Sequence, residues 1–250
     1  MKNFITKSNI TAIAGIFLFF LVWEVISLIA GSEQIFPSPA TTLVSLVKIF
    51  GREGFWASFL LTILRGLSGF LISLVLAFMI GIPAGLSRTF YLMVSPFIVT
   101  MRSVPVISLI LLAIIWLGNE NVPVFIALLT MFPIMVTNII DGIKNVDRNL
   151  LEMGRVYGIK QSSKIKEISI PSILPFLFSG ISSALGFGWR AIIIGEVLSQ
   201  PKYGIGTEMQ NAQIYLEVSE LIAWTLLAVI ISYIFEWSIR RVQKKIIIWK

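Results

Sequence analysis

Residues 59–82 read FLLTILRGLSGFLISLVLAFMIGI and contain a single charged residue, Arg65. A helix of about 20 residues crosses the ~30 Å hydrocarbon core of a bilayer. The stretch therefore predicts a membrane-spanning helix. We expect it to end at Gly81-Ile-Pro-Ala-Gly85, where a proline and two glycines interrupt the apolar run.

The rest of the chain repeats this pattern. Of its 250 residues, 56% are hydrophobic and only 13% are charged, against about 25% charged in soluble domains. Five further stretches are long and apolar enough to span: residues 10–30, 91–118, 122–140, 172–198 and 221–239. We predict an all-α integral membrane protein with about six transmembrane helices, built as one domain over residues 1–250.

Two segments depart from simple spans. Residues 37–57 predict an amphipathic segment at the outer interface, in which Ser38 can cap a helix whose first residue is Pro39. Residues 91–118 are interrupted by Arg102-Ser-Val-Pro105, which predicts a helix that breaks and continues. A broken backbone at membrane depth must face protein or a water-filled cavity.

The basic residues fix an orientation. With the amino terminus inside, fourteen Lys and Arg residues fall on the cytoplasmic side, and only Lys48, Arg52 and Lys202 fall outside. The positive-inside rule then places both termini in the cytoplasm. The net charge of +7 is explained by the membrane rather than by nucleic acid.

Missing residue types restrict the chemistry. The chain has no Cys and no His, which excludes a disulfide, a Cys/His metal site, a cysteine nucleophile and a histidine base. We expect no enzyme, no catalytic residue, no metal and no cofactor in this chain. An intramembrane enzyme would need an Asp pair or a Ser-Lys dyad inside the spans, and a secondary carrier would need inverted repeats and midplane acids. Neither pattern is apparent.

Residues 141–171 form the longest predicted cytoplasmic loop, and they divide into two short helices. Asn149 can cap the first helix, with Glu152 three residues on as in a capping box, and Gly158 suits the left-handed residue that ends it. Its apolar residues lie outside the membrane and require a partner. These residues are Leu150, Leu151, Val156 and Tyr157.

This loop resembles that of ABC-importer permeases. The family's spacing of a Glu, a Gly, an Ile and an aliphatic-Pro pair is met by Glu152, Gly158, Ile168 and Ile170-Pro171, although Met153 stands where the family usually has Ala. Further matches are Phe36-Pro-Ser-Pro39, Gly81 to Gly85, Arg102 to Pro105, Gly188-Trp-Arg190, Glu196 and Gly204-Ile-Gly206. From residue 36 on, the chain is similar to the nitrate/sulfonate/taurine branch, with a type I importer fold.

The resemblance implies a permease that works as a pair in a bacterial inner membrane. ATP-hydrolysing subunits would bind the loop and hold the ATP, a binding protein would deliver cargo from outside, and a second copy would complete the pathway. Cargo would be a small anion such as a sulfonate or nitrate, with a vitamin precursor as the alternative. The expected ATPase-coupling residues are Leu151, Glu152, Gly154, Arg155, Tyr157 and Gly158.

Charged residues in the spans are candidates for the pathway, because a charge near the bilayer centre is costly. The expected pathway residues are Arg102, Pro105, Trp189, Arg190 and Glu196. Glycines 180, 186 and 188 suit either close helix packing or a gate. We expect Glu24 to pair with Arg65, and Glu236 to pair with Arg240 four residues on.

Overall fold

The fold is seen in a computed structural model that describes residues 2–247, without the side chains of residues 2–10 and 12. Within residues 2–247 every regular element is a helix. In chain order these are α1 (Lys2–Ala30), α2 (Pro39–Phe50), α3 (Phe55–Leu86), α4 (Arg88–Ser103), α5 (Val106–Leu117), α6 (Val122–Lys144), α7 (Arg148–Val156), α8 (Gln161–Lys164), a π-helical turn (Ile165–Ser169), α9 (Ile170–Ser199), α10 (Ile205–Ile214) and α11 (Val218–Ile246).

Five of these helices are long and apolar enough to cross a membrane: α1, α3, α6, the continuous helix Gln161–Ser199 that includes α9, and α11. The α4 and α5 pair is long and apolar enough only when the two helices are taken together, with a bend of 97° at the break, so the described residues hold five such helices, or six spans with this pair. The prediction of an all-α membrane protein with about six spans is therefore confirmed.

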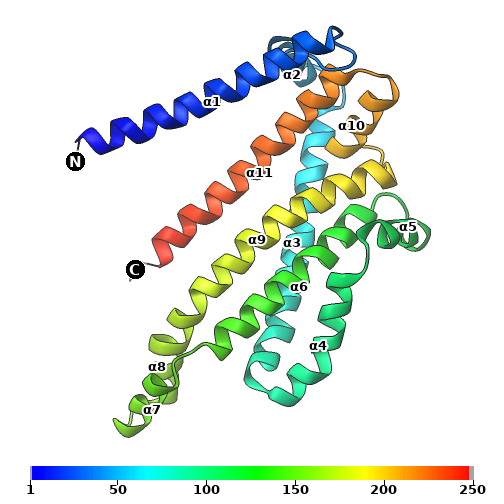
Figure 1. Ribbon diagram of the computed structural model, residues 1–250. Coiled ribbons are helices and arrows are strands. Elements are labelled where there is room, and N and C mark those ends of the chain that lie inside the picture. The colour runs from blue at the N-terminus through cyan, green and yellow to red at the C-terminus, as the bar shows by residue number, and fades with distance from the viewer. Residues whose placement is uncertain (1, 248–250) are drawn as a thin grey trace.

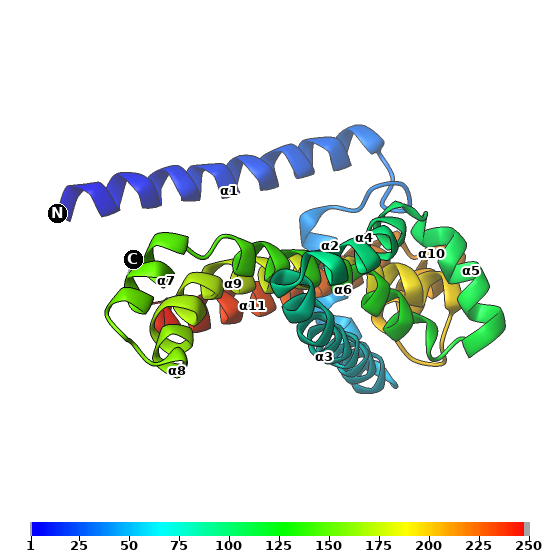
Figure 2. The ribbon, with the colours of Figure 1, turned by 90° about the horizontal axis from the view of Figure 1, so that it is seen from below.

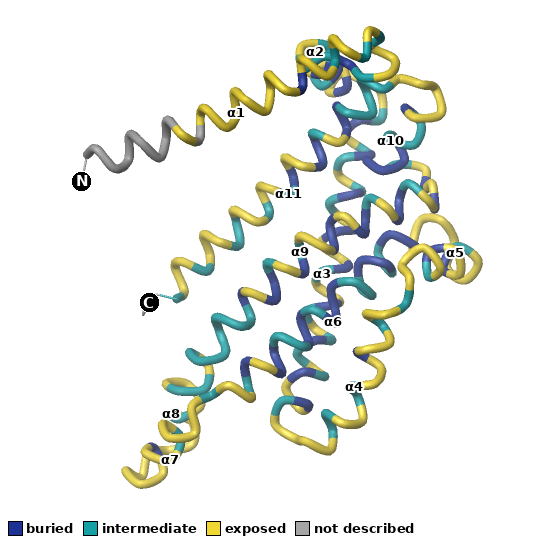
Figure 3. The backbone as a smooth tube through the Cα atoms, viewed as in Figure 1, coloured by how far each residue is buried: buried dark blue, intermediate teal, exposed yellow. Residues whose placement is uncertain are grey.

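Helix α6 lies at the centre of the bundle, with α3 and α9 packed along it (Figure 1, Figure 2). In the most apolar window of α6, 56% of the residues are buried, against 6% for α1. Buried residues gather on α6 and on the parts of α3 and α9 that lie against it (Figure 3). The remaining apolar surface is left for lipid or for other proteins.

Glycines allow the three central helices to approach closely. A Cβ atom at Gly69 of α3 would lie 2.6 Å from the Cβ of Ala127 of α6. On α9, a Cβ atom at Gly180 would lie 2.7 Å from the Cβ of Asn138, and one at Gly188 would lie 2.0 Å from the Cε of Met131. A Cβ atom at Gly186 would meet nothing within 4 Å. Two of the three glycines singled out in this span are therefore packing positions against α6.

The prediction that α3 ends at its proline and glycines is wrong. The helix continues through Pro83 to Leu86. Gly81 and Gly85 lie one turn apart and face α6, where added Cβ atoms would come within 2.9 Å of Ile139 and 2.7 Å of Ile143. Their small size serves contact with α6, and that contact holds the last turn in helical form.

Other helices extend beyond the predicted spans. α6 continues to Lys144, and α11 covers residues 218–246 around the predicted span 221–239. The predicted amphipathic segment 37–57 contains α2, which ends at Phe50, and the first residues of α3, which begins at Phe55. The predicted cap of α2 is present, because the Ser38 side chain accepts a hydrogen bond from the Thr41 N–H at 3.1 Å.

Helix α1 diverges from the bundle and is exposed along most of its described length (Figure 2, Figure 3). Its end is held near α2, where the Trp23 indole N–H donates to the Pro37 carbonyl at 3.0 Å. A cavity of about 330 Å³ between α1 and α11 is lined by apolar side chains that include Phe19 and Leu226. Residues 13–30 of α1 are therefore mostly exposed to lipid or to another chain.

Candidate functional site

Helix α7 lies at the far end of the molecule from α2 and α10, beyond the ends of α6 and α9 (Figure 1). Its cap is Asp147, which has an extended backbone and accepts a hydrogen bond from the Asn149 N–H at 2.8 Å. The predicted Asn149 cap is therefore wrong. Because the chain leaves α6 at Lys144, only a short link precedes the new helix, and Asn149 is already its second residue.

Two glycines shape the rest of this loop. Gly158 has the left-handed φ of +67°, as predicted, and the neighbouring Ile159 N–H bonds the Gly154 carbonyl at 2.9 Å. Gly154 is buried against α8, where a Cβ atom would lie 3.3 Å from the Cγ of Lys164. The chain can therefore reverse at Gly158 and place α8 against α7.

The predicted coupling residues all lie on α7 or in the turn that ends it. Glu152 and Arg155 are exposed, whereas Leu151 is half-buried on the side towards α4 and α6. The side chains of Val156 and Tyr157 project from the loop, with exposed fractions of 84% and 76%. This apolar surface is unpartnered within the part of the chain that the structure describes.

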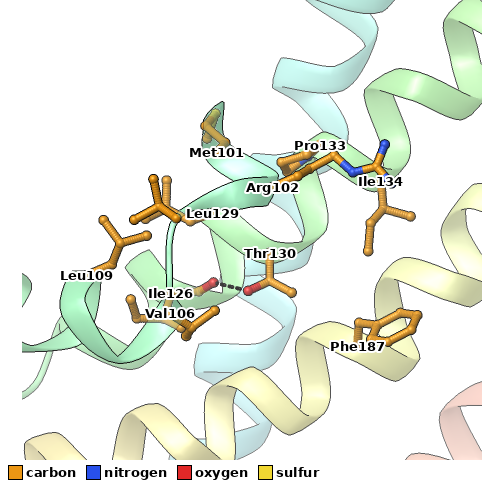
Figure 4. A pocket seen from close by; sticks show the side chains of 11 residues that line it. Met101, Arg102, Val106, Leu109, Ile126, Leu129, Thr130, Pro133, Ile134 and Phe187 are labelled. Atoms are coloured by element: carbon orange, nitrogen blue, oxygen red, sulfur yellow. Dashed lines mark hydrogen bonds between the residues drawn. The ribbon is translucent and has the colours of Figure 1, made fainter. Parts of the chain in front are cut away.

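The break between α4 and α5 carries Arg102. Val104 is extended, with φ −71° and ψ 131°, as the residue before a proline prefers. The side chain of Arg102 is exposed and makes no hydrogen bond or ion pair with the described residues. It lines a cavity of about 330 Å³ with Thr130 of α6 and Phe187 of α9 (Figure 4). Pro105 sits at the break, where its carbonyl accepts from the Ser108 N–H at 3.1 Å.

Trp189 and Arg190 of α9 face different surroundings. The buried Trp189 donates from its indole N–H to the Ala228 carbonyl of α11 at 2.9 Å, and packs edge to face on Phe235. Arg190 is exposed and has no ion-pair partner among the described residues. It lines a second cavity, of about 540 Å³, between α9 and α11. Trp189 therefore joins two helices, while Arg190 and Arg102 line separate cavities.

Glu196 is fully buried at the opposite end of α9 from the coupling loop. Its carboxylate accepts from the Arg65 guanidinium at 2.9 Å and from the Gly206 N–H at 2.9 Å, and the Thr62 hydroxyl lies 2.9 Å from it. Arg65 also donates to the Tyr203 carbonyl at 2.6 Å. These contacts join α3, α9 and the start of α10 in one cluster, which we call the Arg65–Glu196 cluster.

The predicted Glu24–Arg65 pair is wrong, because Arg65 bonds Glu196 and, at 2.5 Å, Glu120. The glycines on either side of Ile205 are the sequence signal that points to Glu196 as the partner of Arg65. A Cβ atom at Gly204 would lie 2.7 Å from the Cδ of Glu196, so the glycines around Ile205 leave room for this carboxylate.

The predicted pair of Glu236 and Arg240 is present, with Nη2 of Arg240 2.6 Å from Oε1 of Glu236.

The sequence is similar to known transport proteins along most of its length. Residues 73–248 match the family described as binding-protein-dependent transport system inner membrane component. An Escherichia coli protein named for aliphatic sulfonate transport is 30% identical over 231 residues, covering 91% of this chain and 87% of that protein. A Bacillus subtilis protein with the same kind of name is 27% identical over 232 residues, covering 92% and 83%. The taurine transport permease protein of Escherichia coli is 24% identical over 233 residues, covering 91% and 84%.

Proposed function

Because the chain belongs to the family of binding-protein-dependent transport system inner membrane components, we propose that two copies of it form the pathway through which an ATP-driven importer carries a small anion. Family membership makes the chain a multi-pass permease subunit of an ABC importer rather than an enzyme. Such importers imply an ATPase and a binding protein as partners. ATP therefore binds to the ATPase, and this chain holds no cofactor of its own.

The proposal of an anionic cargo rests on Arg102 at the helix break, because its side chain has no ion-pair partner among the described residues. An exposed guanidinium in a span must face water or protein, because lipid leaves its charge unsatisfied. Its planar fork suits oxyanions such as sulfonates. The cavity it lines holds no carboxylate. Relatives named for sulfonates and taurine support the same class of cargo.

Uptake measurements in the assembled transporter test this assignment. Arg102→Gln is expected to lower uptake of a radiolabelled alkanesulfonate by about 10-fold, and Arg102→Glu by more, since a like charge repels the anion. Lys245→Gln, which removes an exposed charge at the end of α11, is the matched control. Saturable uptake of only neutral or cationic compounds, such as a vitamin precursor, would defeat the anion assignment.

The proposal assigns ATPase docking to α7 and the turn at Gly158. Two features support it: the exposed apolar side chains of Val156 and Tyr157, and the position of α7 beyond the ends of the spans. Apolar side chains outside the membrane need a protein partner. Closure of the ATPases would then shift the pathway between inward-open and outward-open states by contacts made at α7.

A second copy is proposed for the side of α9 that carries Arg190. Ser183, Gly186, Phe187 and Arg190 are exposed at helical spacing, so they share one side of the helix. A charge on a lipid-facing surface is costly, whereas a second copy would supply protein or enclose water there. Closed symmetry with two copies is also the commonest arrangement of homo-oligomers.

A further inference from the structure

A third cavity, of about 720 Å³, lies between the end of α3, the start of α4, the end of α6 and the start of α7. It is larger than the cavity at Arg102 or the one at Arg190. Leu86 ends α3, Arg88 begins α4 and Lys144 ends α6. Because these positions are span ends, the cavity lies where hydrocarbon gives way to headgroups and water.

The charged side chains that line this cavity are all basic. Arg88, Lys144 and Arg148 line it from three different elements, and no carboxylate does. None of the three makes an ion pair with residues 2–247. Three acids are near them in sequence: Asp147 caps α7, and neither Asp141 nor Glu152 lines the cavity or forms an ion pair among the described residues.

One of these cations is held in place by an aromatic ring. The Lys144 ammonium lies 3.3 Å from the ring centroid of Tyr91, which also lines the cavity. A cation–π contact holds the side chain but leaves the charge uncompensated, so the ammonium can still bind an anion.

The apolar part of the lining suits an acyl chain. Leu86 and Leu92 line the cavity beside Arg88, with exposed fractions of 75% and 60%. A ligand that matches both parts has an anionic head and a hydrocarbon tail. Basic pockets between transmembrane helices bind the headgroups of anionic phospholipids in this way.

We propose that this cavity binds the phosphate of an anionic phospholipid, with the Arg88, Lys144 and Arg148 side chains around the headgroup. Arg148 is the first residue of α7, and Leu151 of α7 also lines the cavity. A bound lipid would therefore contact the proposed coupling helix directly. The orientation predicted from the basic residues puts this lipid in the cytoplasmic leaflet. Lipid binding itself does not depend on that orientation.

Lipid retention by the purified protein tests the proposal without any transport step. Native mass spectrometry in detergent with equal phosphatidylglycerol and phosphatidylcholine should show selective retention of phosphatidylglycerol. The double variant Arg88→Gln/Lys144→Gln should weaken that retention about 5-fold for each charge removed. Lys244→Gln/Lys245→Gln, with the same loss of charge at the exposed end of α11, should retain the lipid as the native protein does.

Three outcomes would overturn the proposal. One is equal retention of the two lipids, and another is equal loss of retention in the two double variants, which would indicate attraction to the whole basic surface. The third is binding of inorganic phosphate that displaces the lipid at millimolar concentration, which would indicate a site for free anions. Arg88→Gln alone, at an exposed position, gives the same readout if the double variant does not fold. Uptake assays test the permease assignment separately.

Discussion

At the scale of single residues, the sequence indicates how deep a side chain lies in the membrane better than it indicates which side of its helix the side chain occupies. The sequence places Glu24 and Arg65 at a similar depth in their predicted spans, and this similarity is the basis for predicting an ion pair between them. The true partner, Glu196, is 131 residues away along the chain from Arg65. Their contact depends on how α3 and α9 are rotated about their axes, and that rotation is fixed by glycine contacts such as Gly69 on Ala127.

The Arg65–Glu196 cluster makes a prediction about stability. Glu196→Ala should lower the free energy of unfolding by about 2–3 kcal/mol, because the buried Arg65 keeps Glu120 but loses Glu196, and the Gly206 N–H loses its acceptor. Tryptophan fluorescence during unfolding in detergent measures the change. Glu236→Gln, which breaks an exposed pair on α11, should cost only about 0.5 kcal/mol. Equal losses in the two variants would show that the buried pair has no special weight.

At the scale of helices, the sequence predicted the break at Pro105 but wrongly predicted one at Pro83. Both prolines disfavour a helical residue before them. The difference is tertiary, because Gly81 and Gly85 hold the last turn of α3 against α6, whereas Val104 precedes a segment that turns away by 97°. Such contacts between elements are not visible in local sequence patterns.

Close packing of α9 on α6 gives a prediction at this scale. Gly188→Leu should destabilise the protein by about 1–3 kcal/mol, because its side chain would enter the space filled by Met131. Gly186→Ala is the matched control on the same helix, since a Cβ atom there meets nothing within 4 Å. Apparent melting temperature and elution as a single species measure both. A stable Gly188→Leu protein would mean that α6 and α9 do not pack this closely.

The turn that ends α7 gives a prediction about coupling. Gly158→Val should reduce substrate-stimulated ATP hydrolysis at least about 5-fold, because a β-branched residue is strained at a φ of +67° by about 1 kcal/mol or more. Gly158→Asn should retain most of the activity, since Asn tolerates this conformation. Nothing lies within 4 Å of the added Cβ, so a steric clash does not confuse the comparison. Full activity in Gly158→Val would remove α7 from the coupling mechanism.

At the scale of the whole molecule, the lengths of the apolar stretches were sufficient to predict the fold class, and the motif from Glu152 to Pro171 was sufficient to predict the family. The path of α1 was not predictable, because a uniformly apolar sequence does not indicate which helix it packs against. The orientation remains a prediction from the excess of cytoplasmic Lys and Arg.

Cysteine labelling tests the orientation cleanly, because the native chain has no Cys. An impermeant thiol reagent on intact cells should label Lys202→Cys, in the turn before α10, and should spare Lys160→Cys, in the turn before α8. Permeabilised cells should label both, which controls for access. Labelling of position 160 in intact cells would reverse the orientation.

The central claim is an ATP-driven anion importer whose permease couples through α7, and transport by the reconstituted assembly tests it most directly. Proteoliposomes that hold the permease, its ATPase and its binding protein should accumulate a labelled alkanesulfonate only when ATP is supplied on the ATPase side. Accumulation should fall sharply in Gly158→Val and in Arg102→Glu. Accumulation driven by an ion gradient without ATP would contradict the account and would identify a secondary carrier instead.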